Sequence, residues 1–446
     1  MTRAKNILLI SLDDAVAFRK VQSLFGADLQ TPNLDRICAQ STLFDNAYCQ
    51  APVCSPSRAS MMTGKAPHQT GVTGPERDIF ARLPVRLFWP RQLKLAGYYT
   101  SSGGKVIKSY TPLPRRAHAR LFCDDPKIFQ IERRRTVFAR KGQPDPMPKR
   151  AYGGFRAGHA TTDPADDVTY YDHQVASSAI DFLQGYDGDA PFYREVGFHD
   201  PHGPWTTPQR FKELYDHRLF TPPPDWARGF DPCPAMDRVS PPNISDTSLD
   251  YWQKSLRNYF SAYSHADHHL GRVWDALKAS RHADTTLVVI VSDHGLHLGE
   301  RNRIGKHTLW EQVANVPLIL HDPADPRAQV VTDPVALLDV GPTIMDYAGL
   351  PPIRRSPGRS LRPLLQGARA PDRAILTVHF DNAAIRKGRY RFIRYHDGST
   401  QLFDLSRDWW QTDDLGPGHP KHAILLDTLI ETCRTHGLEL PLHSTP

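Results

Sequence analysis

Short apolar runs bounded by turn residues alternate along most of the chain with longer stretches of helical periodicity. Such runs are typical of strands that are buried on both faces of a parallel sheet. The predicted strands are residues 7–12, 98–101, 192–197, 287–292 and 316–320. The predicted helices are residues 33–40, 57–63, 168–183 and 256–279. This alternation predicts an α/β fold in which a large, mostly parallel sheet is sandwiched by helices.

The pattern changes after residue 352, where short alternating segments replace the long helical stretches. Antiparallel strands are predicted at residues 374–379, 384–387, 390–395 and 401–405, followed by a helix at 421–436. We therefore expect a large catalytic domain over residues 1–365 and a small C-terminal α+β domain over residues 366–446.

Polar residues follow several predicted strands at the point where each strand ends. These residues are Asp13 and Asp14, then Lys105, then His199 and His202, and finally Asp293 and His294. Ligands of open α/β sheets bind at the carboxyl ends of the strands. The sequence thus predicts one site assembled from segments that are far apart in the chain.

A divalent cation is the natural partner of this group. Asp13, Asp14 and Asp293 would repel one another if they gathered without a cation, and His294 adds a nitrogen ligand. The oxygen majority favours Ca²⁺, while the imidazole leaves Mn²⁺ or Mg²⁺ open. Taken alone, a pair of aspartates after a strand is more often an Asx turn or a helix cap than a metal site.

The run Cys54-Ser55-Pro56-Ser57-Arg58 is the most informative short motif. Proline is tolerated in the first turn of a helix, so Cys54 is expected at or just before a helix N-terminus. Free N–H groups and the helix dipole favour an anion there, and Arg58 lies about one turn further on. The alternative is a small buried thiol in a helix-start turn.

These segments together resemble the formylglycine-dependent (type I) sulfatases, within the alkaline-phosphatase-like superfamily. The resemblance rests on Cys54-x-Pro56-Ser57-Arg58, and it continues through the other motifs in order. Those motifs are residues 6–14, 31–35, 198–202, 292–295, 305–307, 339–343 and 401–405. Their order and spacing are most similar to the iduronate-2-sulfatase branch. The resemblance covers the chain except for about residues 109–165 and the last residues.

The resemblance implies that a formylglycine-generating enzyme binds the chain transiently and oxidises Cys54 to Cα-formylglycine, the nucleophile. It also implies that Asp13, Asp14, Asp293, His294 and an oxygen of residue 54 hold the metal. Arg58 and the metal would polarise the nucleophile, and Lys105 and Lys306 would hold sulfate oxygens. His202 or Lys306 would protonate the departing alcohol.

One position departs from the iduronate-2-sulfatase branch, which has Gly-Lys-Val-Phe-His where this chain has Gly104-Lys105-Val106-Ile107-Lys108. The family histidine assists the second step of the reaction. Lys108 with a lowered pKa is one replacement for that base, and His118, His199 and His307 are others.

The positive charge of the chain is concentrated in one segment. Residues 105–156 carry a net charge of +10 against −3 elsewhere. We expect residues 109–156, within an insertion at about residues 109–165, to form a basic rim or lid beside the site. It would select a small, sugar-like sulfate ester that bears a second anionic group. The alternative is a solvated surface insertion.

Two other functions remain open. The first is a phosphodiesterase or phosphonate monoester hydrolase of the same superfamily. The second is nucleic-acid binding by a degenerate enzyme, which the few aromatics among the arginines do not favour.

The remaining properties bear on location. No apolar run reaches membrane-spanning length, and the N-terminal residues leave no room for a signal peptide before the first strand. The 6 cysteines show neither zinc spacing nor a disulfide framework. We expect a cytoplasmic protein with free thiols; the sequence leaves its oligomeric state open.

Overall fold

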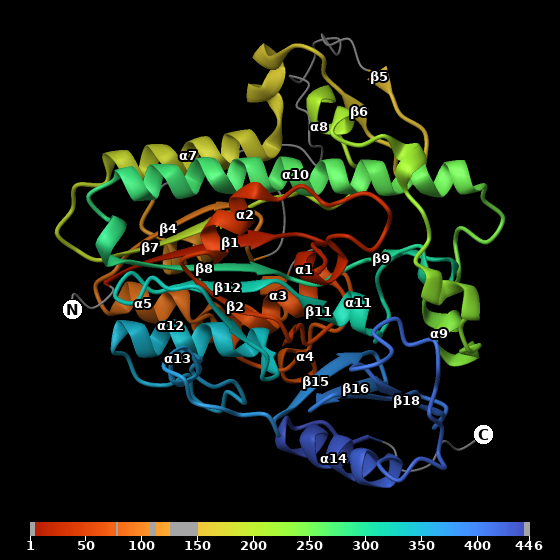
Figure 1. Cartoon of the computed structure of the whole chain (residues 1–446). Coiled ribbons are helices and arrows are strands. Elements are labelled where there is room, and N and C mark those ends of the chain that lie inside the picture. The colour runs from red at the N-terminus through yellow and green to blue at the C-terminus, as the bar shows by residue number, and fades with distance from the viewer. Residues whose placement is uncertain (1–4, 77–78, 108–112, 125–149, 441–446) are drawn as a thin grey trace.

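A 7-stranded sheet runs through the middle of the molecule, in the order β13-β2-β12-β8-β1-β7-β4 (Figure 1). The computed structural model describes residues 5–76, 79–107, 113–124 and 150–440 of the chain. The strands of the sheet are β1 (Asn6–Leu12), β2 (Thr42–Phe44), β4 (Tyr99–Gly104), β7 (Phe192–Gly197), β8 (Thr286–Ser292), β12 (Leu318–His321) and β13 (Gln329–Val331).

The sheet is mostly parallel, as predicted. Strand β1 pairs in parallel with β7 and β8, β4 pairs in parallel with β7, and β13 pairs in parallel with β2. Strand β12 is antiparallel to both β8 and β2, so the prediction of a parallel strand over residues 316–320 was wrong. Pro317 divides that run into β11 (Asn315–Val316) and β12, because proline cannot donate to a sheet ladder.

Helices cover both faces of the sheet. The upper layer in Figure 1 contains α2 (Pro32–Cys38), α7 (Tyr171–Gly185) and α10 (Leu249–Ala279). The short helix α1 (Phe18–Val21) contributes Phe18 and Val21 to the same core. The lower layer contains α3 (Cys54–Thr63), α5 (Pro90–Leu95) and α12 (Val340–Ala348). Alternate residues of β1 enter opposite cores: Leu8 and Ile10 pack beneath α7 and α10, whereas Ile7 and Leu9 pack toward α3 and α12.

Short elements connect these layers. The helices are α4 (Pro67–Thr70), α6 (Arg115–Leu121), α8 (Gln209–Glu213), α9 (Pro234–Val239), α11 (Glu311–Ala314) and α13 (Arg362–Leu365). The strands are β3 (Ala47–Tyr48), β5 (Arg150–Ala151), β6 (His159–Ala160), β9 (His297–Leu298), β10 (Ile304–Gly305) and β14 (Val335–Ala336).

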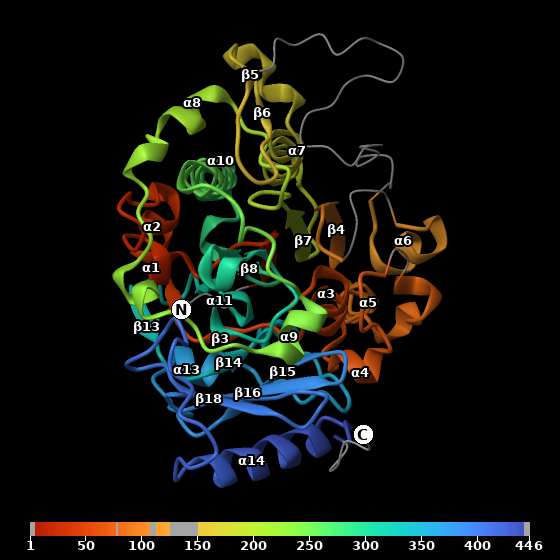
Figure 2. The ribbon, with the colours of Figure 1, turned by 90° about the vertical axis from the view of Figure 1, so that its right-hand side faces the viewer.

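The C-terminal part forms its own antiparallel sheet beneath the main body (Figure 2). Its strands are β15 (Ala374–His379), β16 (Asn382–Lys387), β17 (Tyr390–Arg394) and β18 (Thr400–Asp404), and α14 (His422–Thr435) follows them. One face of the sheet packs on α14 through residues such as Phe392 and Leu429. The other face packs on Leu309 and Trp310 of the main body. The exact division at residues 365 and 366 stays a prediction.

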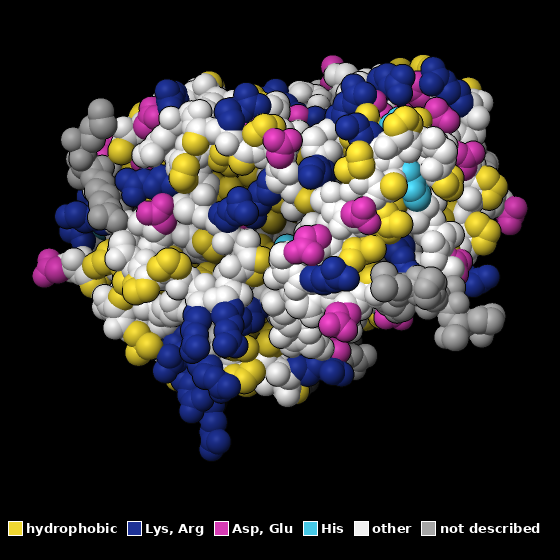
Figure 3. Space-filling view, turned by 90° about the horizontal axis from the view of Figure 1, so that it is seen from below, with side chains coloured by type: hydrophobic (Ala, Val, Ile, Leu, Met, Phe, Trp, Pro, Cys, Tyr) yellow, Lys and Arg dark blue, Asp and Glu magenta, His cyan; other side chains and the backbone are white. Residues whose placement is uncertain are grey.

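The surface and the cysteines add two further facts. Acidic, basic and apolar side chains are mixed over the lower face, except where Lys and Arg side chains gather at one edge (Figure 3). All the cysteines lie within the described residues, and each is a free thiol. No helix in the described ranges has the length and apolar character that a membrane span requires.

Candidate active site

The polar residues that follow β1, β4, β7 and β8 meet at one edge of the main sheet, as predicted. The ends of β4 and β7 approach closely because both are glycines. A Cβ atom on Gly104, whose φ is +81°, would lie 2.1 Å from the Gly197 carbonyl oxygen. The next residue, Lys105, donates its backbone N–H to that same oxygen at 2.9 Å. The close approach therefore fixes where the Lys105 side chain begins.

Cys54 lies in the first turn of α3, where the helix N-terminus favours an anion. Val53, with φ −158° and ψ 145°, precedes the helix in an extended conformation. The Cys54 sulfur lies 3.1 Å from Lys306 Nζ, 3.3 Å from His294 Nε2 and 3.6 Å from Asp13 Oδ1.

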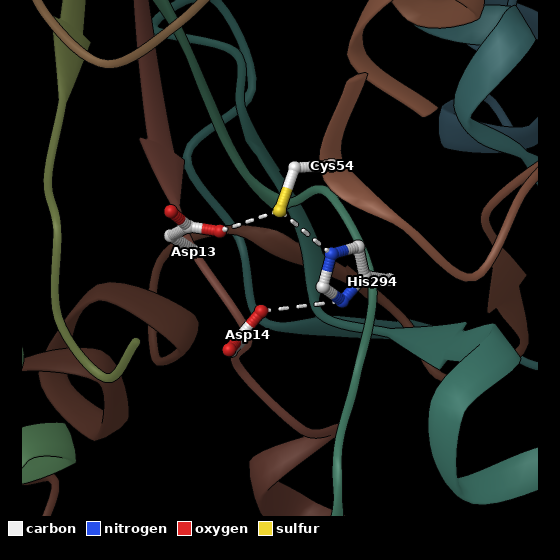
Figure 4. A group of neighbouring side chains, drawn as sticks. All are labelled: Asp13, Asp14, Cys54 and His294. Carbon is white, nitrogen blue, oxygen red and sulfur yellow. Dashed lines mark hydrogen bonds and ion pairs between the residues drawn. The ribbon is translucent and has the colours of Figure 1, made fainter. Parts of the chain in front are cut away.

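Asp13, Asp14, Cys54 and His294 point toward one another (Figure 4), and one ligand atom of each lies within 4.8 Å of the others. His294 donates its Nδ1–H to the Gly295 carbonyl at 3.0 Å, so Nε2, which lies 3.3 Å from the Cys54 sulfur, is the ring nitrogen that would face a metal ion. Carboxylate oxygens with an imidazole nitrogen are a suitable donor set for a divalent cation. The residues present therefore fit the predicted metal.

Asp293, the remaining predicted metal ligand, lies beside this group, with its Oδ2 3.6 Å from His294 Nε2. Its Oδ2 accepts from Arg58 Nε at 2.8 Å. Its Oδ1 accepts from the backbone N–H groups of His294 at 3.0 Å and of Asp14 at 3.3 Å. In this arrangement Asp293 shapes the turn that carries Asp14, whose φ is 61°.

Arg58 is fully buried, and its donors are directed at the protein. Besides Asp293, the guanidinium donates to the carbonyl groups of Lys105 at 2.6 Å, Val106 at 3.0 Å and Leu12 at 3.1 Å. It thereby ties the ends of β1, β4 and β8 to α3. Burial opposes its charge, yet Asp293 and Asp13 keep the pKa of Arg58 above its ordinary value. These contacts support an organising role for Arg58.

Two ammonium groups flank the carboxylates. Lys105 Nζ forms an ion pair with Asp13, and Lys306 Nζ lies 2.6 Å from Asp14 Oδ1. Burial alone would raise the pKa of Asp13, but Lys105, followed by His202 and Arg58, holds it well below its usual range. Burial likewise opposes the charge of Lys306, while Asp14 raises its pKa. Both lysines therefore stay charged.

His202 stands at the opening of this group. Its Nε2 lies 3.8 Å from Asp14 Oδ2, and its side chain is 20% exposed. Burial lowers the pKa of His202 to about 4 although Asp14 acts in the opposite direction. His199, the other histidine of this loop, is buried with its ring centroid 5.1 Å from that of His202.

The sequence did not reveal every residue that shapes the site. Asp172, in the first turn of α7, accepts the backbone N–H groups of His199 and Asp200 at 2.6 and 2.9 Å. Tyr259 of α10 donates its hydroxyl to the Asp14 carbonyl at 2.8 Å. Neither residue lies in a motif, so only tertiary structure identifies them. The predicted catalytic residue Lys108 lies outside the described residues.

The sequence is similar to those of known sulfatases over most of its length. A sequence profile described as "Sulfatase" matches residues 5–350. A sulfatase of Formosa agariphila is 31% identical over 427 residues, which is 90% of this chain and 81% of that protein. The choline-sulfatase of Rhizobium meliloti is 29% identical, covering 92% of this chain and 82% of its own. Human iduronate 2-sulfatase is also 29% identical, covering 78% and 70%.

Solved structures share the fold. A protein in complex with its substrate D-glucosamine-2-N,6-O-disulfate superposes with a TM-score of 0.74 at 19% identity, covering 98% of both chains. The phosphonate monoester hydrolase of Agrobacterium radiobacter gives the same TM-score, 0.74, at 20% identity, covering 97% of this chain and 95% of its own. At these identities the likeness concerns the fold alone.

Proposed function

The chain belongs to the sulfatase family and is a sulfuric ester hydrolase, and from this premise we propose that residue 54 attacks the sulfate monoester of a small anionic molecule. One observation carries the proposal. Cys54 begins α3, and its sulfur lies within 3.6 Å of a lysine, a histidine and an aspartate that come from three other segments. A nucleophile placed among cations at a helix N-terminus suits an anionic substrate.

Residue 54 is proposed to act after modification. A formylglycine-generating enzyme would bind the chain transiently and convert Cys54 to formylglycine. The modified residue would supply a hydrated aldehyde, one of whose hydroxyl groups is the nucleophile once it is activated by the groups around it. Burial of Arg58 beneath the site supports a role in holding the turns that surround residue 54, rather than direct contact with sulfate.

Asp13, Asp14, His294 and residue 54 would hold a divalent cation, with Asp293 beside them. Ca²⁺ is preferred because oxygen ligands predominate, and Mn²⁺ or Mg²⁺ are the alternatives. When bound, the cation supplies positive charge that stabilises developing negative charge in the reaction.

Lys105 and Lys306 are proposed to hold the non-bridging sulfate oxygens. In this structure each lysine forms an ion pair with a carboxylate of the proposed cation site, and each ammonium group stays charged. A charged ammonium with a raised pKa is a poor proton donor, so these lysines suit binding better than proton transfer.

His202 is therefore the proposed proton donor for the departing alcohol. Without substrate its pKa is held low by burial first, with repulsion from Lys306 and Lys105 adding to that effect. A sulfate ester between the two lysines would cancel that repulsion and favour the imidazolium form. His202 would then donate its proton to the leaving oxygen.

The substrate is proposed to carry a second anionic group, as a sulfated sugar acid does. Arg156, the last basic residue of the segment 105–156, is exposed, and its side chain lies against Gly203, next to His202. A guanidinium at this place would attract a carboxylate or a second sulfate. Three other arginines of this segment, Arg133, Arg134 and Arg135, lie outside the described residues.

A substrate panel tests this function. Protein carrying formylglycine should hydrolyse aryl sulfates and, with higher kcat/KM, a sulfated sugar acid. Choline sulfate should be a poor substrate, because a quaternary ammonium group prefers aromatic faces to a nearby guanidinium. Preference for a phosphodiester or a phosphonate monoester would instead support the alternative function. A cytoplasmic location stays a prediction.

A further inference from the structure

Behind the loop that carries His199 and His202, a chain of buried polar side chains runs into α10. Asp200 Oδ2 lies 2.7 Å from His265 Nδ1. His265 Nε2 lies 2.9 Å from His269 Nε2, and His269 Nδ1 lies 3.1 Å from Arg272. Asp200, His265 and His269 are each 1% exposed. Within the described residues, none of these side chains contacts the groups proposed to bind or protonate the substrate other than through the loop itself.

The direction of every hydrogen bond in this chain is determined. A guanidinium can only donate, so His269 Nδ1 accepts from Arg272 and the ring proton of His269 lies on Nε2. That proton is donated to His265 Nε2, which leaves the proton of His265 on Nδ1. His265 must then donate to Asp200. Burial also lowers the pKa of His265 to about 3, in agreement with a neutral ring.

The chain ends on the catalytic loop itself. The backbone N–H groups of His199 and Asp200 donate to the two carboxylate oxygens of Asp172. The His202 N–H donates to the His199 carbonyl at 3.0 Å, which closes the turn. The Asp172 carboxylate thus holds the backbone of the turn, and His265 holds the turn through the side chain of Asp200. His202 projects to the opposite side, toward Asp14.

Stability alone is a weak explanation for this arrangement. Asp172 and Asp200 are two acids in one buried region, and burial raises the pKa of both well above the usual value. The second oxygen of Asp200 accepts no hydrogen bond among the described residues. Buried polar groups of this kind are often no more stabilising than apolar residues of similar volume. The need to hold the turn 199–202 in one conformation explains these buried polar residues better.

We propose that Asp200 and His265 are positioning residues that hold the turn 199–202 so that His202 reaches the leaving oxygen of the sulfate ester. This inference rests on the proposed function. Hydrogen bonds whose donors and acceptors are all fixed restrict the turn to one conformation. A proton donor requires such a restriction, because it must lie about 3 Å from the oxygen that it protonates.

Leaving-group dependence provides the test. Asp200→Leu removes the acceptor for His265, whereas Asp200→Asn retains one. We expect Asp200→Leu to lower kcat about 100-fold for an alkyl sulfate but only about 10-fold for 4-nitrophenyl sulfate, because a good leaving group needs less protonation. KM should change less than about threefold, and Asp200→Asn should recover most of the loss. His268→Ala, beside His269 on the same helix but outside the hydrogen-bonded chain, is the matched control and should behave as the unaltered enzyme.

A double-mutant cycle separates positioning from general damage to the fold. In a His202→Ala background, Asp200→Leu should change kcat by less than about twofold, because the group that it positions is already gone. An equal loss in both backgrounds, or an equal loss for both leaving groups, would overturn the proposal. If Asp200→Leu lowers the unfolding temperature strongly, His265→Leu and His265→Gln replace it in the same cycle, since the glutamine amide retains a donor. Failure of the unaltered, formylglycine-bearing protein to cleave any sulfate ester would instead reject the proposed function.

Discussion

The ammonium nitrogen of Lys306 lies 3.1 Å from the sulfur of Cys54 and 2.6 Å from Asp14 Oδ1. It therefore touches both the proposed nucleophile and a proposed metal ligand. Lys306→Met keeps the length of the side chain and removes its charge. We expect kcat/KM for an aryl sulfate to fall by about 10²–10³, the usual effect of removing one donor to an oxyanion. Lys254→Met, which removes an exposed partner of Asp250, should change kcat/KM less than about twofold.

Removal of the cation should abolish hydrolysis. After dialysis against a chelator, we expect activity to return with Ca²⁺ and the unfolding temperature to rise with Ca²⁺ concentration, because the ion binds only the folded state. Asp14→Asn should eliminate that rise, whereas Asp35→Asn, in α2 and paired with Arg19, should retain it. If activity returned with Mn²⁺ or Mg²⁺ but not with Ca²⁺, the ion would be assigned as Mn²⁺ or Mg²⁺ in place of Ca²⁺. Full activity after complete removal of divalent ions would contradict the assigned ligands.

Arg156 should distinguish substrates by charge. Arg156→Gln should raise KM about 10-fold for a sulfated sugar acid, the loss expected for one hydrogen bond to a charged group. For a mono-anionic aryl sulfate the change should be less than about twofold, and added salt should reduce the difference. Arg115→Gln, an exposed arginine of α6, is the control. Equal effects of Arg156→Gln on both substrates would remove the support for a second anionic group.

Glu195 should make stability depend on pH. Its carboxylate is buried within β7 and accepts from Ser102 Oγ and Tyr193 OH, each at 2.8 Å. Burial raises the pKa of Glu195 to about 7. The folded state thus holds this proton more tightly than the unfolded chain, and stability is lost as pH rises from about 4.5 to 7, by roughly 3 kcal/mol in all.

Glu195→Gln mimics the protonated form, so it should stabilise the protein above pH 7 and have little effect near pH 4. Denaturant unfolding of both proteins across this range provides the comparison. Glu431→Gln, which alters an exposed pair with Arg434, should show no such trend. A constant difference between Glu195→Gln and the unaltered protein at every pH would show that Glu195 does not titrate in this range.

The strands at the centre of the sheet were predictable because burial on both faces leaves a continuous apolar run. Strands β1, β7 and β8 lie within one residue of their predicted bounds. The strands β2, β13 and β14 were missed because two or three residues show no periodicity. Helix α10 begins at Leu249, earlier than the predicted residue 256, because Ser248 caps its N-terminus through the Tyr251 N–H.

The site was predictable where motifs place polar residues directly after strands. Asp13, Asp14, Cys54 and His294 come together as expected. The backbone partners of Arg58 could not be predicted, because they are carbonyl groups of residues outside its motif, among them Leu12 and Val106. The contact between Asp200 and His265 joins a loop to the middle of a helix 65 residues away, and no local pattern signals such a pair.

The central claim is that residue 54 becomes formylglycine and performs the reaction. Mass spectrometry of the peptide that contains residue 54 tests this most directly, on protein produced together with a formylglycine-generating enzyme and assayed for sulfate release from an aryl sulfate. We predict that the specific activity rises in proportion to the fraction of peptide with the formylglycine mass, and that Cys54→Ala has no activity while its unfolding temperature stays close to that of the unaltered protein. Full activity in protein whose residue 54 is entirely cysteine, or in Cys54→Ala, would contradict the account.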